Sequence, residues 1–205
     1  MQGITEFLPI SSSGHLVIAE AVLGQPPNST YNILLHGGTL ASILIFYHRK
    51  ILDLLRQDRR VIPLLIVGTL PAAMIGIAIK LSFEEVLEKP LVAACLLPVT
   101  GLVVWWSNRR PDGEETYRHL TFRKTLLIGL FQSFALLPGL SRSGLTIAAG
   151  LSLGLRRDQA TTFSFLLAIP AILGAMVLGC KDFLTGAAAP VTVEQIIGTV
   201  IAAIV

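Results

Sequence analysis

The sequence predicts an all-α polytopic membrane protein with a single membrane domain, residues 1–205, built as an inverted-topology repeat with two re-entrant helical hairpins. Three observations lead to this prediction. Hydrophobic residues make up 53% of the 205 residues, charged residues only 14%, and the mean hydropathy is +0.71. This composition is too apolar for a soluble domain with a polar surface. A motif also occurs twice, and basic residues gather in alternate loops.

Four apolar segments are long enough to cross a hydrocarbon core of roughly 30 Å. They are residues 31–47, 61–81, 90–106 and 163–179, and residues 196–205 begin a fifth. We expect the chain to be truncated at both ends, because the fifth segment is cut short and the first motif starts at residue 2 with no helix before it. The two repeats are predicted over about residues 1–106 and 123–205.

The charges of the connecting segments predict the topology. Residues 48–60 and 107–124 each carry five Lys or Arg, and residues 156–157 are both Arg. The positive-inside rule places these segments in the cytoplasm. The segment 82–89 carries three Glu and the segment 25–30 has no charge, so both belong outside. Membrane spans separate the basic residues, which argues against nucleic acid as a partner.

The repeated motif predicts two broken helices. Residues 1–15, MQGITEFLPISSSGH, return in altered form at 132–145 as QSFALLPGLSRSGL, and a shift of 130 residues lays Ser11 on Ser141. Each copy leads from an apolar stretch through Pro into a turn of small and hydroxyl residues. Irregular backbone at mid-membrane depth is tolerated only where it lines a cavity walled by protein. Two matching breaks therefore predict one shared site.

The two hairpins are predicted to have opposite orientations. Residues 125–137 enter from the cytoplasmic side, turn at 138–144 and return along 144–155 to the basic pair that follows. By the same reasoning, the first copy enters from outside, turns at 9–14 and returns outside. This arrangement is the inverted repeat of many transporter folds.

The two turns carry groups that suit a phosphate or pyrophosphate. Helix N-termini at about Ser13–Gly14 and Ser143–Gly144 would present free backbone N–H groups to an anion. Arg142 adds a planar cation that matches phosphate oxygens. Helix capping could explain the serines, but not an unpaired Arg at membrane depth, which costs about 3 kcal/mol or more. The predicted diphosphate-binding residues are Gln2, Ser11, Ser13, Gly14, Gly139, Ser141, Ser143 and Gly144.

Candidate proton-transfer groups lie beside the first turn. Glu6 sits within an apolar run with no neutralising neighbour in the sequence, and His15 follows the turn. A carboxylate and an imidazole facing Arg142 and several hydroxyls can hydrolyse a phosphoanhydride. His36 has no such neighbours in the sequence, and we interpret it as a polar group within the bundle or near its outer boundary, with a role in the site less favoured.

The motifs QGITEFLPISSSGH and LPGLSRSG, together with FSFLLAIPAILGA, resemble the undecaprenyl-diphosphate phosphatase family, often called the bacitracin-resistance protein family. The resemblance covers residues 2–205. It implies a hydrolase of the bacterial inner membrane that converts undecaprenyl diphosphate to undecaprenyl phosphate, recycling the lipid carrier for peptidoglycan and other cell-wall polymers. The resemblance also implies that the protein confers resistance to bacitracin.

The resemblance implies roles for particular residues. The family's Glu/Gln-x-x-x-Glu motif falls on Gln2 and Glu6, its essential His on His15, and its Arg on Arg142. Mg²⁺ or Ca²⁺ usually supports the activity, and Glu6 is the candidate protein ligand. Gln at the first acidic position makes a metal held by two carboxylates of this motif doubtful.

The mechanism predicted from these residues places Arg142 and the turns around the diphosphate in a site open to the periplasm or cell exterior, with Glu6 and His15 handling the proton. Attack on phosphorus comes either from a serine, with Ser12 favoured, or from water. The alternative is a secondary transporter or lipid-phosphate flippase built on the same repeat. Membrane lipid is the expected surrounding, and a homo-oligomer remains open.

Overall fold

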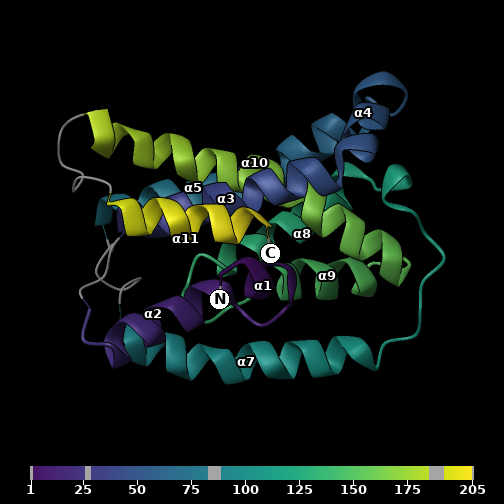
Figure 1. Cartoon of the computed structure of the whole chain (residues 1–205). Coiled ribbons are helices and arrows are strands. Elements are labelled where there is room, and N and C mark those ends of the chain that lie inside the picture. Colours follow the sequence, from purple (N-terminus) through teal and green to yellow (C-terminus); the bar gives the residue numbers. More distant parts are fainter. Residues whose placement is uncertain (1, 26–28, 83–88, 185–191, 205) are drawn as a thin grey trace.

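The computed structural model describes residues 2–25, 29–82, 89–184 and 192–204, and most of these residues are helical, with no strand among them (Figure 1). The acidic segment predicted outside, 82–89, falls almost entirely outside the described residues. The helices are α1 (Gln2–Phe7), α2 (Ser12–Val22), α3 (Ser29–Phe46), α4 (His48–Arg56), α5 (Val61–Ser82), α7 (Pro90–Asn108), η1 (Tyr117–His119), α8 (Phe122–Phe134), α9 (Arg142–Ser152), α10 (Arg157–Leu184) and α11 (Val193–Ile204).

Three of the described helices are long and apolar enough to cross a membrane: Val61–Ile79, Pro90–Asn108 and Arg157–Leu178. The apolar helices Tyr31–Phe46 and Gln195–Ile204 are shorter. Large apolar side chains on these helices remain exposed in the isolated chain, including Met74, Leu91 and Val177. Such a surface is stable when lipid covers it, which confirms the predicted all-α membrane class.

Both copies of the motif form pairs of short helices interrupted by a turn. The first pair is α1 and α2, and the second is α8 and α9. In Figure 1 these short helices lie between α7 on one side and α3, α10 and α11 on the other. Accordingly, α7 packs against α2 and α9, while α10 packs against α9 and α3 packs against α1. The two interruptions therefore lie inside the bundle, and their re-entrant passage through a bilayer remains a prediction.

The tips of the two pairs touch each other. A Cβ on Gly14 would lie 2.7 Å from the Cα of Gly139, so the close approach requires glycine. Gly139 has φ +94° and Ser11 has φ +64°, both in the left-handed region. Thr100 of α7 fixes the second tip, because its hydroxyl donates to the Gly139 carbonyl at 2.7 Å and accepts from the Ser141 N–H at 3.0 Å. The tips thus form one rigid centre.

The main apolar core lies beside this centre and joins the two halves of the chain. It includes Leu64 of α5, Ile128 of α8 and Phe163 of α10, each no more than 1% exposed. One feature differs from the sequence prediction. Residues 48–60 were predicted as a connecting loop, but they contain helix α4, whose Leu54 packs into this core. The segment HRKILDLLR is strongly amphipathic, which is typical of a surface helix, and the prediction of a loop rested on its charges alone.

Candidate active site

The two serine turns share one capping hydrogen bond, although Ser11 has a left-handed backbone and Ser141 an extended one. The Ser11 side chain accepts from the Gly14 N–H at 3.3 Å, and the Ser141 side chain accepts from the Gly144 N–H at 3.1 Å. Each serine is therefore the N-cap of the helix that follows. The capping hydroxyls occupy the N–H groups of Gly14 and Gly144, and anion binding at the two helix N-termini, about Ser13–Gly14 and Ser143–Gly144, stays a prediction.

A buried ion pair joins the two motifs. Arg142 Nη2 donates to Glu6 Oε1 at 2.7 Å, although the residues are 136 positions apart. The Glu6 side chain is 6% exposed and the Arg142 side chain 16%. Two charges with so little solvent are tolerated because they neutralise each other. Glu6 of the first motif and Arg142 of the second therefore neutralise each other, although neither has an oppositely charged neighbour in its own motif.

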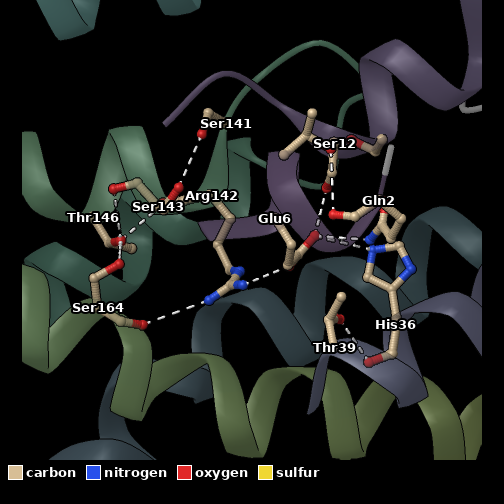
Figure 2. A network of polar contacts seen from close by, with 12 residues as sticks. Gln2, Glu6, Ser12, His36, Thr39, Ser141, Arg142, Ser143, Thr146 and Ser164 are labelled. Carbon is tan, nitrogen blue, oxygen red and sulfur yellow. Dashed lines mark hydrogen bonds and ion pairs between the residues drawn. The ribbon is translucent and has the colours of Figure 1, made fainter. Parts of the chain in front are cut away.

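The second oxygen of the Glu6 carboxylate faces three further side chains (Figure 2). Oε2 accepts a short hydrogen bond from the Ser12 hydroxyl and a second, at 2.9 Å, from the Gln2 amide. His36 Nε2 lies 3.8 Å from the same oxygen. A carboxylate that accepts directly from a hydroxyl can act as a general base on it.

The Arg142 guanidinium is held by Glu6 and by α10. Its second terminal nitrogen, Nη1, donates to the Ser164 carbonyl of α10 at 3.5 Å. The Thr146 hydroxyl donates to the backbone carbonyl of Arg142 at 2.8 Å, within α9. Thr146 and Ser164 are themselves joined through their hydroxyls at 2.7 Å. A guanidinium carries five N–H donors, so the contacts with Glu6 and Ser164 orient it and leave donors for a phosphate.

A cavity of about 420 Å³ opens beside these groups. Apolar side chains from α2, α3 and α10 form much of its wall, among them Leu16, Val17, Ile33 and Ile172. Such a wall suits a ligand that joins a charged head to a hydrocarbon chain. The predicted site residues that line the cavity are Glu6, Ser11, Ser12, Ser13, Ser141, Arg142 and Ser143.

Five predicted site residues do not line this cavity: Gln2, Gly14, His15, Gly139 and Gly144. Gln2 instead donates to Glu6 from one turn earlier in helix α1. The three glycines lie at the tips of the two helix pairs. His15 is half-buried, and its Nδ1 lies 2.8 Å from the Ser11 carbonyl, within its own turn of helix α2. No hydrogen bond or ion pair joins His15 to Glu6 among the described residues, and their joint role in proton transfer stays a prediction.

Sequence reasoning gave too little weight to two residues of the cavity wall. His36 lines it, together with Gln132 of α8. Gln132 is the counterpart of Gln2 under the 130-residue shift, which was a usable signal. The Oε1 atom of Gln132 is buried and has no hydrogen-bond partner among the described residues. His36 lies in an apolar helix outside both motifs, and only the packing of α3 against α1 brings it to Glu6.

The donor set does not suit a metal held mainly by the protein. The described residues contain no group of three or more His, Cys, Asp or Glu side chains placed to bind an ion. Both Glu6 oxygens already accept from neighbours, one from Arg142 and the other from Ser12 and Gln2. A divalent cation needs about six ligands, so most would have to come from a phosphate ligand and water. The prediction of Glu6 as a metal ligand therefore lacks support from this geometry.

Fold and site together define a helical membrane protein with a buried carboxylate, guanidinium and serine hydroxyls held between two broken helices. The family described as Bacitracin resistance protein BacA matches residues 1–205, and the chain belongs to this family.

Relatives with curated names cover most of the chain. A protein from Rhodopirellula baltica is 55% identical over 185 residues, which are 90% of this chain and 72% of that protein. One from Carboxydothermus hydrogenoformans is 43% identical over 89% of this chain and 71% of its own length. A third, from Methanosphaera stadtmanae, is 38% identical over 98% of this chain and 82% of its own length. All three are named undecaprenyl-diphosphatase.

Proposed function

We propose that this protein is an undecaprenyl-diphosphatase, which hydrolyses undecaprenyl diphosphate to undecaprenyl phosphate and inorganic phosphate. The observation that carries the proposal is the joint placement of Glu6, Ser12 and Arg142 on one cavity. These side chains supply a base, a nucleophile and a cation for phosphoryl transfer. Family membership and the names of the relatives agree with this chemistry.

In the first step, the Arg142 guanidinium binds oxygens of the terminal phosphate and stabilises their charge in the transition state. The Ser12 O–H bond breaks and its proton passes to Glu6 Oε2. The Ser12 oxygen forms a bond to the terminal phosphorus, and the bond from that phosphorus to the bridging oxygen breaks. Undecaprenyl phosphate leaves with the electron pair and takes the proton from Glu6.

In the second step, water attacks the phosphorylated serine. Glu6 accepts a proton from the water, the bond between phosphorus and the Ser12 oxygen breaks, and Glu6 returns the proton to that oxygen. Inorganic phosphate leaves, and the enzyme regains its starting state. The competing mechanism, direct attack of water on the diphosphate, needs the same base and cation but no bond to Ser12.

We propose that Mg²⁺ or Ca²⁺ acts on the diphosphate oxygens. When bound, such an ion neutralises phosphate charge. The donor set described above supports an ion that arrives with the substrate, because the described residues offer few free ligands. The protein's own contribution remains the orientation of Arg142, Glu6 and Ser12.

The cellular setting follows from the charges and the cavity wall. We propose a multi-pass protein of the bacterial inner membrane, with the basic segments in the cytoplasm and the cavity open to the periplasm or cell exterior. The isoprenoid tail would lie along the apolar wall and the surrounding lipid. Recycling of the lipid carrier there would serve cell-wall synthesis and confer bacitracin resistance. The transporter or flippase alternative finds no support, since the matched relatives carry an enzyme name.

The test is release of inorganic phosphate from undecaprenyl diphosphate by the purified protein in detergent, with Mg²⁺ or Ca²⁺ added. We expect steady turnover by the unaltered chain, and undecaprenyl phosphate formed in equal amount. A carrier without hydrolytic activity would bind the lipid but release no phosphate, and that result would refute the proposal.

A further inference from the structure

We infer that His36 is a positioning residue, which holds the Glu6 carboxylate from the side opposite Arg142 so that Oε2 faces Ser12. The inference rests on the proposed function and adds a residue from outside both sequence motifs. His36 belongs to α3, lines the same cavity as Glu6, and has a side chain that is 29% exposed. Figure 2 shows its ring beside Glu6.

The orientation of the imidazole is fixed from its other edge. His36 Nδ1 lies 2.7 Å from the Asn32 carbonyl, one turn earlier on α3. A carbonyl oxygen only accepts, so Nδ1 carries a hydrogen and donates it. The ring cannot turn without losing this bond, and Nε2 is left as the atom that points to Glu6 Oε2, at 3.8 Å.

The helix that carries His36 is closely packed at this level. A Cβ on Gly38 would lie 2.4 Å from the Thr199 carbonyl of α11, and a Cβ on Gly37 would lie 3.2 Å from the Met176 Cε of α10. Close packing on two sides leaves α3 little freedom to move away. The His36 imidazole is therefore held in place beside the Glu6 carboxylate.

Glu6 lies between two nitrogen groups. Arg142 contacts Oε1 at 2.7 Å, and His36 faces Oε2 from another helix. Gln2 and Ser12 also donate to Oε2, but without His36 they alone would oppose rotation of the carboxylate toward Arg142, where both oxygens would face the guanidinium, the geometry that such pairs favour. Ser12 would then lose its acceptor. Because Nδ1 already carries a hydrogen, Nε2 attracts Oε2 only in the imidazolium form, in which both ring nitrogens are N–H donors. That second N–H opposes the rotation and keeps the hydroxyl contact.

The fold itself does not require polar groups at these positions. The shift of 130 residues that aligns the motifs places Glu6 on Leu136 and His36 on Leu166. Leu166 is fully buried in the apolar core. The carboxylate and the imidazole therefore occur together in the first repeat and are both replaced by leucine in the second, as expected if they work as a pair.

The experiment compares two amides at position 36. Gln places its amide nitrogen near the position of Nε2, whereas Asn reaches only the position of Nδ1. We expect His36→Gln to keep kcat within about threefold, and His36→Asn and His36→Leu to lose about 10–100-fold, the scale of a misplaced catalytic group. KM should stay within about threefold throughout, since the substrate contacts of Arg142 are untouched.

The matched control is His48→Asn. His48 Nδ1 likewise lies 2.7 Å from a backbone carbonyl, that of Ile45, but the residue is exposed and does not line the cavity. This variant should turn over normally. Equal kcat for His36→Asn and the unaltered chain, equal losses for Gln and Leu, or losses confined to KM would each overturn the inference. Failure of the unaltered chain to release phosphate would instead refute the proposed function.

Discussion

Replacement of Glu6 by Gln tests the reaction chemistry with little change in shape. The variant loses the negative charge that contacts Arg142 at 2.7 Å and accepts from Ser12. Loss of a general base lowers turnover by about 10²–10⁴-fold, which corresponds to roughly 3–5 kcal/mol in the activation barrier. Arg142 is also left buried without an anion, and breaking such a pair costs about 3–5 kcal/mol of stability. We expect both losses in one variant.

The two losses are separated by measuring kcat, KM and thermal unfolding on the same detergent preparation. Lower kcat at saturating substrate in protein that remains folded at the assay temperature identifies the chemical role. The control is Glu20→Gln, which alters another carboxylate of the same cavity wall. Its kcat should fall by less than about tenfold. A Glu6→Gln enzyme with normal kcat and only a raised KM would refute the assignment of Glu6 as base.

Three further predictions concern the cation, the second histidine and the topology. Arg142→Lys should lower kcat/KM by roughly 10²–10³-fold, because a point charge cannot replace the planar fork; near-normal phosphate release would exclude that role. His15→Ala should lower kcat by about tenfold, and His15→Asn should restore most of that kcat, because Asn can still donate to the Ser11 carbonyl. A kcat that Asn does not restore would argue that the imidazole itself moves a proton. A cysteine at Gln25 should react with an impermeant thiol reagent from outside intact cells and one at Glu114 should not, and the reverse pattern would invert the proposed orientation.

The sequence predicted the broken helices well because their signals are local. Proline, small residues and a repeated motif mark each turn, and the structure places the two turns in contact through Gly14 and Gly139. The site members Glu6, Ser12 and Arg142 were also predicted, since charged groups in apolar stretches are costly unless they have a function. Their pairing across 136 residues follows from packing, which no local pattern records.

The sequence was least decisive where two local interpretations competed. Free helix N-termini and serine caps fit the same residues, and the structure shows that Ser11 and Ser141 cap their own helices. His15 was preferred to His36 because it lies near the motif in the chain. On a helix that follows a turn, however, His15 bonds back to Ser11, while His36 reaches Glu6 from a different helix.

The most direct test of the mechanism is the stereochemistry at the transferred phosphorus. Undecaprenyl diphosphate with an isotopically chiral terminal thiophosphate is hydrolysed in isotopically labelled water, and the configuration of the released thiophosphate is determined. Attack by Ser12 followed by attack of water makes two in-line displacements, each with inversion, so the account predicts net retention. Net inversion would mean one displacement by water and would contradict the role assigned to Ser12.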